Sequence, residues 1–387
     1  MRLPMIAVLT SLAAPVAAAP CGGDFQGFLT AMAGEAKAQG LPDAAIQSFM
    51  NGAQRDGSVI KADRGQGIFR KTFLEFETSL ISKSRIGNAA VYSKKYNAAF
   101  DAALQKFGVT RGIILAFWAF ETDFGQVQGD FNTRNALVTL AQDCRRPDLF
   151  QPQVLAAIAL TAKGDFNPAT AKGAWAGEIG MVQMLPRDIL ERGEDGDGDG
   201  VISLKTSAPD AILSAAHMLQ FYGWQAGQPA LQEVTVPADL DWSKTGLTKA
   251  LPTAQWAAMG VKARSGSLAN LQGSILLPQG RKGPAFMAYP NYKVLFEWNK
   301  SFVYVTTAAY FASRIEGAPA LNPGKPDPAL SLDAMTGLQK KLAARGYDVG
   351  KIDGILGAAT RAAVQKEQVR LGQAADGWPT AALLAAL

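Results

Sequence analysis

The sequence predicts a mainly α-helical (α+β) protein with a small β-sheet inserted in its second half and a short helical domain at its C-terminus. Three observations support this fold class. Apolar residues recur at spacings of three and four over long stretches, which is the period of an amphipathic helix. Short runs bounded by Gly and Pro replace that pattern between residues 232 and 299. A proline-rich segment then precedes residues 331–387, and a length of 387 residues allows two or three domains.

Residues 1–18 have the features of a secretory signal peptide, because Arg2 precedes an apolar stretch that ends in small residues. We place the cleavage after Ala18, since a cut one residue later would put Pro20 directly beyond the scissile bond. The protein is therefore expected in the periplasm. Cys21 raises the alternative of a lipoprotein anchor, which Pro20 disfavours because such signals need a small residue at that position.

Composition excludes several classes of protein. With 48% hydrophobic and 18% charged residues, the chain is expected to fold rather than to stay disordered. A net charge of +5 favours acidic partners such as an anionic wall polymer, whereas no basic run with interleaved aromatics points to nucleic acid. No later run of about 18 apolar residues predicts a membrane span. We expect the protein to act as a monomer.

The two cysteines of an exported chain favour a disulfide between Cys21 and Cys144. Such a bridge would hold the N-terminus against the body of the protein, and it would stabilise the fold mainly by restricting the unfolded chain. Two buried free thiols are the alternative.

Helices are expected over most of residues 25–160, where Phe73, Phe76 and Leu80 illustrate the spacing of three and four. The same pattern resumes over residues 210–223 and stops at a glycine. These segments form the helical body.

Between residues 232 and 299, three runs rich in β-branched and aromatic residues are predicted to be strands: 234–242, 274–278 and 292–298. We interpret them as a small inserted sheet. A helix over residues 302–315 then returns the chain to the body.

Residues 317–330 contain four prolines and two glycines, a composition that extends rather than packs. We interpret this segment as a linker with few contacts across it. Residues 331–387 would then form a second domain that acts by tethering.

The main chemical signal is the segment 118–125, Trp-Ala-Phe-Glu-Thr-Asp-Phe-Gly, which is predicted to close an apolar helix that begins near Arg111 and stops at Gly125. On a helix, Glu121 shares its neighbourhood with aromatic side chains such as Phe117. Burial among aromatics raises a carboxyl pKa and favours the protonated acid, which can then act as a general acid. A solvated glutamate at a helix end is the alternative interpretation.

A second segment, residues 173–186 (GAWAGEIGMVQMLP), alternates small residues with Trp175 and Gln183. Small residues let a polymer approach the backbone, and the Gln183 amide is suited to bind sugar hydroxyl or acetamido groups. Taken singly, these residues are also typical of turns and cores.

Together these two segments resemble the lytic murein transglycosylase B family, and the resemblance extends over residues 25–315. It implies a lysozyme-like helical catalytic domain at residues 19–316, with the small β-rich insertion at residues 232–299, that cleaves the glycan strands of peptidoglycan. By this resemblance Glu121 is the single catalytic acid and Gln183 a substrate-binding glutamine. Trp175 and Met181 are expected to join Gln183 in binding substrate.

A third segment, residues 298–304, is similar to the family's aromatic-Asn-x-Ser-x-x-Tyr motif that lines the cleft. The resemblance implies substrate-binding roles for Trp298, Asn299, Ser301 and Tyr304. A strand-to-helix junction capped by Asn299 is the alternative.

The chain departs from the family pattern at three cleft positions. Met181 and Val182 stand where the family usually has an aromatic residue and a glycine, and Trp298 stands where a tyrosine is usual. These differences affect the expected stacking on sugars and leave the acid unchanged.

The resemblance also implies a mechanism. Glu121 would protonate the bond between N-acetylmuramic acid and N-acetylglucosamine and then, as a base, deprotonate the muramoyl 6-hydroxyl, which closes a 1,6-anhydro ring. The second carboxylate that hydrolases usually need has no match, since Asp123 and Asp130 are interpreted as helix-end or loop acids. The single histidine, His217, leaves little material for a His-based triad, and no catalytic cofactor is expected. A hydrolytic muramidase and a noncatalytic wall-binding protein are the alternatives.

An acidic segment follows the glutamine motif. Asp195, Asp197 and Asp199 occupy positions one, three and five of an EF-hand calcium loop, and the carbonyl of Val201 occupies position seven. The acid of position twelve is missing, and Asp210 would close the loop instead, as in the longer loop that the resemblance implies. We expect a structural calcium ion, with a solvated acidic turn as the alternative.

Residues 331–387 are similar to the type-one peptidoglycan-binding domain, in which glycine-rich and acidic turns join three short helices. Glu367 replaces the aromatic residue that usually precedes Gln368. The expected partner is the peptidoglycan glycan strand, while partners in the cell-wall machinery stay unspecified.

Overall fold

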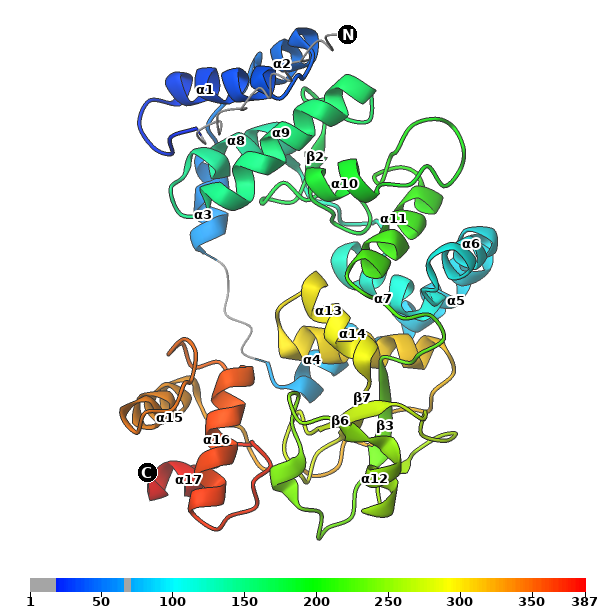
Figure 1. The fold of residues 1–387 in the computed structure, drawn as a ribbon, viewed down its shortest axis with the longest axis vertical. Coiled ribbons are helices and arrows are strands. Elements are labelled where there is room, and N and C mark those ends of the chain that lie inside the picture. The colour runs from blue at the N-terminus through cyan, green and yellow to red at the C-terminus, as the bar shows by residue number, and fades with distance from the viewer. Residues whose placement is uncertain (1–18, 66–70) are drawn as a thin grey trace, which may run out of the picture. The chain divides into compact units, whose positions relative to one another are not determined.

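The computed structural model describes residues 19–65 and 71–387, so the predicted signal peptide at residues 1–18 lies outside the described residues. The prediction of a mainly helical fold with a small sheet is confirmed (Figure 1). The chain divides into two compact units, which are described separately below. Within the described ranges, no helix has the length and apolar composition that crossing a membrane requires.

The first unit comprises the residues up to Arg64 together with Gly129–Glu178 and Leu185–Leu190. Its helices are α1 (Phe25–Ala38), α2 (Asp43–Met50), α3 (Gly57–Arg64), α8 (Thr133–Gln142) and α9 (Pro147–Lys163). A short antiparallel pair, β1 (Phe131–Asn132) with β2 (Lys172–Gly173), precedes the loop that carries Trp175. Nearly every residue of α8 is buried, which makes this helix the centre of the unit.

The predicted disulfide between Cys21 and Cys144 is present in the first unit, with Cα atoms 5.1 Å apart. Two further bonds hold the same segment against α8: Gly22 N donates to Gln142 O at 2.7 Å, and Gln142 Nε2 donates to Gly23 O at 3.0 Å. The start of the described chain is therefore fixed to the unit both covalently and by hydrogen bonds.

The second unit comprises Gly65–Gln128, Ile179–Met184 and Glu191–Leu387, and α10 (Pro186–Arg192) lies across the boundary between the units. Its helices are α4 (Phe73–Leu80), α5 (Lys83–Lys95), α6 (Asn97–Phe107), α7 (Arg111–Thr122), α11 (Ala208–Phe221), α12 (Thr253–Ala258), α13 (Pro290–Trp298), α14 (Phe302–Ile315), α15 (Leu332–Ala344), α16 (Ala358–Arg370) and α17 (Ala381–Ala386). Nine of the twelve residues of α7 are buried, because this helix is apolar nearly all round and lies at the centre of the unit.

The inserted sheet has five antiparallel strands in the order β4-β6-β7-β3-β5. The strands are β3 (Leu231–Thr235), β4 (Leu251–Pro252), β5 (Lys262–Ala263), β6 (Gln272–Leu276) and β7 (Ala285–Ala288). Trp256 and Met287 are fully buried in its core. The predicted strand at 274–278 is confirmed as β6, whereas the run at 234–242 is extended only as far as Thr235 and ends at a 3₁₀ turn, Trp242–Lys244.

The prediction of a strand at residues 292–298 is wrong, because this segment is helix α13. Pro290 occupies the first turn, where its missing N–H costs no helical hydrogen bond. The buried residues Tyr292 and Leu295 are three apart, which is a helical spacing. Alternating large apolar residues over so short a run had suggested a strand.

Residues 331–387 form three short helices, as expected, around a core that includes Leu338, Leu342 and Val364. The buried Gln339 connects the turns of this domain, since its side chain accepts from Gly354 N at 2.8 Å and donates to Ile355 O at 3.0 Å. Glu367 is fully buried and pairs with Arg370 at 2.6 Å.

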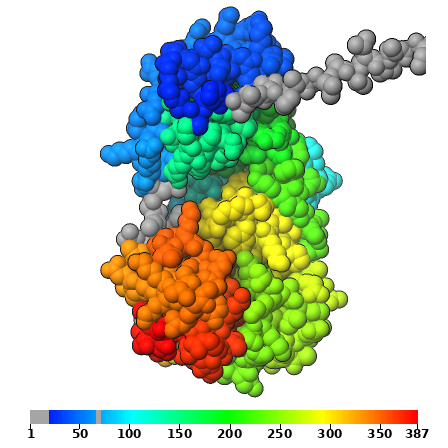
Figure 2. All heavy atoms as spheres, turned by 60° about the vertical axis from the view of Figure 1, so that its left-hand side comes forward, coloured from blue at the N-terminus to red at the C-terminus, as the bar shows by residue number. Residues whose placement is uncertain are grey.

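The expectation of few contacts across the linker is wrong. Side chains of α16 bond to the main chain of the insertion, with Gln365 reaching Thr245 and Arg361 reaching Pro278. In Figure 2 the orange-to-red surface of the C-terminal residues adjoins the yellow-green surface of the insertion. The proline content of the linker predicts an extended segment, but it does not determine which surfaces the segments on either side bring into contact.

Candidate active site

The catalytic candidate Glu121 lies in the last turn of α7, next to an unusual reversal of the chain. Asp123, Phe124 and Gly125 have φ values of 50°, 58° and 85°, so three successive residues are left-handed and the helix ends earlier than the predicted stop at Gly125. Arg85 holds the Asp123 carboxylate through an Nε–Oδ1 bond of 2.9 Å. A left-handed Phe is sterically costly and persists only where its surroundings enforce it.

The same strain recurs at the predicted substrate-binding glutamine. Among the described non-glycine residues, positive φ occurs only at Asp123, Phe124 and Gln183. Strained backbone of this kind clusters at functional sites, and here it marks both sequence segments that were predicted to carry chemistry.

One carboxylate oxygen of Glu121 accepts two hydrogen bonds from the third predicted segment. The Tyr304 hydroxyl donates to Glu121 Oε1 at 2.5 Å, and Trp298 Nε1 donates to the same oxygen at 3.1 Å. Burial raises the pKa of Glu121, and the hydrogen bonds from Tyr304 and Trp298 oppose that rise without cancelling it. Burial therefore favours the protonated form of the Glu121 carboxyl, while the two donors favour its charged form.

Aromatic rings hold these two donors in place. Phe117 of α7 stacks on Trp298, with ring centroids 4.4 Å apart and planes within 7°. Phe120 meets Tyr304 edge to face, with centroids 5.8 Å apart. The pKa of the Tyr304 hydroxyl is raised well above its usual value by burial and by the neighbouring Glu121, so Tyr304 is a donor and not a base.

The loop that carries Gln183 is closed by a pair of main-chain bonds between Ile179 and Met184 and is fastened to the end of α7. Thr122 Oγ1 donates to Met181 O at 2.6 Å. Gln183 Nε2 donates to Gly180 O at 2.8 Å. No role was predicted for Thr122, although its buried hydroxyl connects the two predicted segments.

The structure gives Asn299 and Ser301 a local role at a helix-to-helix junction, where the sequence had suggested a strand-to-helix junction. Ser301 caps α14, and its hydroxyl accepts from Tyr304 N at 3.3 Å. Asn299 Oδ1 accepts from Ser301 N at 2.9 Å. Both residues therefore orient the turn that presents Tyr304. Trp175 belongs to the first unit, where it lies partly exposed in the loop after β2.

The acidic segment brings together three of its predicted ligands. Carboxylate oxygens of Asp195, Asp197 and Asp210 lie within 4.8 Å of one another, and Asp210 is fully buried. Asp199 is turned differently, since its carboxylate accepts from Val201 N at 2.8 Å. Hard oxygen donors grouped around a buried carboxylate fit a calcium ion, which would relieve their mutual repulsion.

The comparisons with known proteins cover both parts of the chain. Residues 24–313 match the transglycosylase SLT domain family, and residues 331–387 match a peptidoglycan binding domain family. The chain is 26% identical over 304 residues to the membrane-bound lytic murein transglycosylase B of Escherichia coli (strain K12), covering 73% of this chain and 81% of that protein.

Two solved structures are similar to the chain. SltB3 from Pseudomonas aeruginosa, in complex with NAG-anhNAM-pentapeptide, has a TM-score of 0.85 and 33% identity and covers 94% of this chain and 99% of that chain. The Escherichia coli lytic transglycosylase SLT35 in complex with calcium has a TM-score of 0.63 and 25% identity and covers 77% of this chain and 96% of that chain.

Proposed function

The chain belongs to the lytic murein transglycosylase B family, with an SLT transglycosylase domain and a peptidoglycan binding domain, and we propose that Glu121 is its single catalytic acid and base. The protein is thus an enzyme that acts on peptidoglycan. The observation that carries the proposal is the Glu121 carboxyl, whose pKa burial raises and whose Oε1 accepts from both Tyr304 and Trp298.

In the first step, protonated Glu121 would donate to the oxygen that links N-acetylmuramic acid to N-acetylglucosamine. The raised pKa favours the protonated form needed for this donation. Once the proton has left, the hydrogen bonds from Tyr304 and Trp298 stabilise the carboxylate. The same two donors therefore serve the charged state that the second step requires.

In the second step, the Glu121 carboxylate would take the proton of the muramoyl 6-hydroxyl while that oxygen attacks the anomeric carbon. The bond between the sugars breaks, a 1,6-anhydro ring forms, and no water is consumed. The groups bonded to the carboxylate are a phenol and an indole, and the nearby Asp123 is already paired with Arg85, so a second carboxylate for hydrolysis is not supplied by these residues. The anhydro sugar named in the SltB3 complex supports this outcome.

Substrate binding is proposed for the remaining cleft residues that the sequence indicated. Gln183, whose amide nitrogen is held by its own loop, would accept from a sugar with its amide oxygen. Met181 and Trp298 would offer apolar contact to sugar faces. Asn299 and Ser301, in the turn between α13 and α14, would contact substrate beside Trp298. For Trp175, which belongs to the first unit, the proposal is the substrate-binding role that the family resemblance implies.

We also propose a structural calcium ion held by Asp195, Asp197 and Asp210, with Asp199 and the Val201 carbonyl completing the set. The grouped carboxylates and the calcium complex of SLT35 support this site. The ion would fix the loop after α10 and would take no part in the chemistry.

The remaining proposals concern where and in what form the enzyme works. We propose that residues 1–18 direct export and are then removed. Residues 19–316 would form the catalytic domain, and residues 317–330 would connect it to a binding domain at residues 331–387. The enzyme would act as a monomer. The disulfide supports an oxidising, extracytoplasmic location. Peptidoglycan is the partner that the family and the second domain support.

Replacement of Glu121 by Gln tests the mechanism, because the amide keeps the shape and loses the transferable proton. We expect turnover of purified sacculi to fall by at least about 100-fold, with folding and sacculus binding retained. Mass spectrometry of the products separates the mechanisms, since an anhydro end is lighter than a hydrolysed end by one water. Hydrolysed ends from the wild type would contradict the transglycosylase step, and substantial anhydro product from Glu121→Gln would contradict the role of Glu121.

A further inference from the structure

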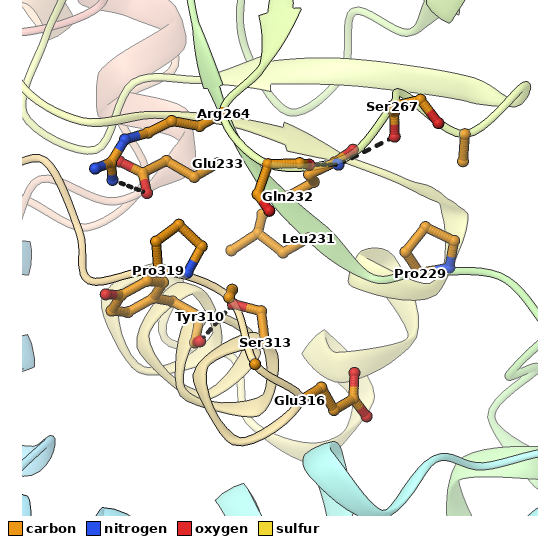
Figure 3. Close-up of a pocket in the computed structure, with 14 residues that line it drawn as sticks. Pro229, Leu231, Gln232, Glu233, Arg264, Ser267, Tyr310, Ser313, Glu316 and Pro319 are labelled. Carbon is orange, nitrogen blue, oxygen red and sulfur yellow. Dashed lines mark hydrogen bonds and ion pairs between the residues drawn. The ribbon is translucent and has the colours of Figure 1, made fainter.

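The proline-rich segment is fastened along the insertion, and we call residues 318–327 the strap. Leu321 N donates to the Tyr310 hydroxyl at 2.7 Å, and Asn322 N donates to Glu233 Oε1 at 2.9 Å. Figure 3 shows Tyr310 beside Pro319, at the edge of a cavity of about 420 Å³ between β3 and the end of α14. These bonds, together with that from Arg264 Nη1 to Ala320 O at 2.7 Å, hold the strap against the insertion.

Beyond the strap, the C-terminal domain meets the insertion through buried polar contacts, and we call this contact the seam. Gln365 Nε2 donates to Trp242 O at 3.0 Å and to Thr245 O at 2.9 Å, while Lys249 Nζ donates to Gln365 Oε1 at 2.6 Å. At Gly280 an added Cβ would lie 2.7 Å from Trp378 Cβ, so the two surfaces are in close contact. A domain on a flexible tether would not need such contacts.

Arg361 is the most unusual group at the seam. Its guanidinium donates to Pro278 O at 2.7 Å and to Leu277 O at 3.3 Å, and it lies 4.7 Å from the centre of the Phe302 ring. Burial lowers the pKa of Arg361 to about 10. The Arg361 side chain is half-buried, and these hydrogen bonds go to carbonyl groups and not to a carboxylate. A cation held in this way depends on the carbonyls and the aromatic face staying in place.

Phe302 connects the seam to the catalytic acid. It is the first residue of α14, and Tyr304, two residues later, donates to Glu121. The N–H groups in the first turn of a helix have no partners within the helix, so caps and side-chain packing hold that turn. In α14 the cap is Ser301, whose hydroxyl accepts from Tyr304 N at 3.3 Å. The side-chain packing is supplied by the Arg361 guanidinium, which lies over the Phe302 ring.

We propose that Arg361 is a positioning residue for catalysis: by its contact with Phe302 it fixes the first turn of α14 and thereby the Tyr304 hydroxyl that donates to Glu121. The proposal rests on the proposed role of Glu121. The C-terminal domain then contributes to the chemical step itself, and its effect extends to substrates too short to benefit from tethering.

The experiment compares Arg361→Met with Arg370→Met in the full-length enzyme. Both residues lie on α16, but Arg370 pairs with Glu367 inside the C-terminal domain and makes no bond across the seam. The substrate is a soluble tetrasaccharide of two disaccharide repeats with its stem peptides. The readouts are kcat, KM and the pH profile of kcat, with thermal melting as the measure of folding.

Arg361→Met is expected to lower kcat by about 10-fold to 100-fold, because displacement of a catalytic group by about 1 Å costs up to that much. KM should change by less than about twofold, since binding contacts are not removed. The high-pH limb of the kcat profile should move to higher pH, because a displaced Tyr304 no longer opposes the raised pKa of Glu121. Arg370→Met should keep the wild-type kcat and profile.

A double-mutant cycle asks whether Arg361 acts through Tyr304. In a Tyr304→Phe background, Arg361→Met should lower kcat by less than about twofold further, because the group that it positions is already gone. Three results would overturn the proposal: a folded Arg361→Met enzyme with wild-type kcat and profile, an equal loss with and without Tyr304, or an equal loss in Arg370→Met.

Phe302→Leu provides the test if Arg361→Met does not fold, since it removes the ring and leaves the guanidinium and its carbonyl partners. The same fall in kcat and the same shift of the profile are expected, and a wild-type profile would overturn the proposal. Failure of the proposed function would appear as hydrolysed ends in the products of the wild-type enzyme. The comparison of kcat between variants can be made with either product, so it tests the role of Arg361 separately.

Discussion

Removal of the Tyr304 hydroxyl by Tyr304→Phe gives the sharpest test of how Glu121 works. The ring would keep its contacts with Phe117 and Phe120, while Glu121 Oε1 would lose its bond of 2.5 Å and keep only the bond of 3.1 Å from Trp298. A hydrogen bond to a charged group contributes about 1.5 to 3 kcal/mol. Since each 1.36 kcal/mol corresponds to a factor of ten in rate, kcat should fall by roughly 10-fold to 150-fold.

The direction of the pH effect follows from the form that the bond stabilises. Tyr304 donates to the carboxylate and so lowers the pKa of Glu121, against the larger effect of burial. Without the hydroxyl the pKa of Glu121 rises further, the acid keeps its proton to higher pH, and the high-pH limb of the kcat profile moves to higher pH. The assay is kcat against pH on a soluble glycan fragment.

Tyr347→Phe is the matched control, because it removes a hydroxyl that bonds Glu367 within the C-terminal domain. This control should keep the wild-type profile. A Tyr304→Phe enzyme whose high-pH limb stays in place, or moves to lower pH, would refute the reasoning that Tyr304 stabilises the Glu121 carboxylate.

Three further predictions concern stability. Calcium should raise the melting temperature of metal-free enzyme, because a ligand that binds the folded state stabilises it. Asp197→Asn should remove most of this rise. Equal melting temperatures with and without calcium would mean that the segment is an acidic turn that binds no ion. Reduction of the Cys21–Cys144 bridge, which spans 123 residues, should lower the free energy of unfolding by about 2 to 5 kcal/mol, and two titratable thiols in denatured, unreduced protein would exclude the bridge. Gly180→Ala should lower the urea midpoint, since φ is +78° and the added Cβ would lie 2.4 Å from Leu204 O; an unchanged midpoint would contradict this strain.

Local signals in the sequence were sufficient for the helical body and for the candidate acid. The spacing of three and four predicts α4, the apolar run from Arg111 predicts α7, and the aromatic residues around Glu121 indicate a desolvated carboxyl. The pKa of Glu121 is indeed raised, with burial as the main cause. Each of these inferences depends on residues within a few positions of one another.

Long-range contacts were beyond such reasoning. Trp298 and Tyr304 are separated from Glu121 by 177 and 183 residues, so their role as its hydrogen-bond donors depends on how α14 packs against α7. Arg361 is one of 38 basic residues, and no spacing marks it as the one that bonds to main-chain carbonyls across the seam. The prediction of few contacts across the linker was wrong for the same reason. Composition indicates that the linker is stiff, but it does not indicate that α16 contacts the insertion.

The strand pairing of the insertion has a consequence for building hybrid enzymes. The sheet of the insertion spans residues 231–288, and α13 follows it. Leu231, where the chain enters this sheet, pairs with Ala288, where the chain leaves it, and antiparallel partners lie about 5 Å apart. Residues 231–288 could therefore be replaced by the matching segment of a homologue without opening a gap in the helical body. Gln365 bonds to the main-chain carbonyls of Trp242 and Thr245, which any residue at those positions would supply. A transplanted segment would therefore keep these contacts with residues 331–387 if its backbone follows the same path there.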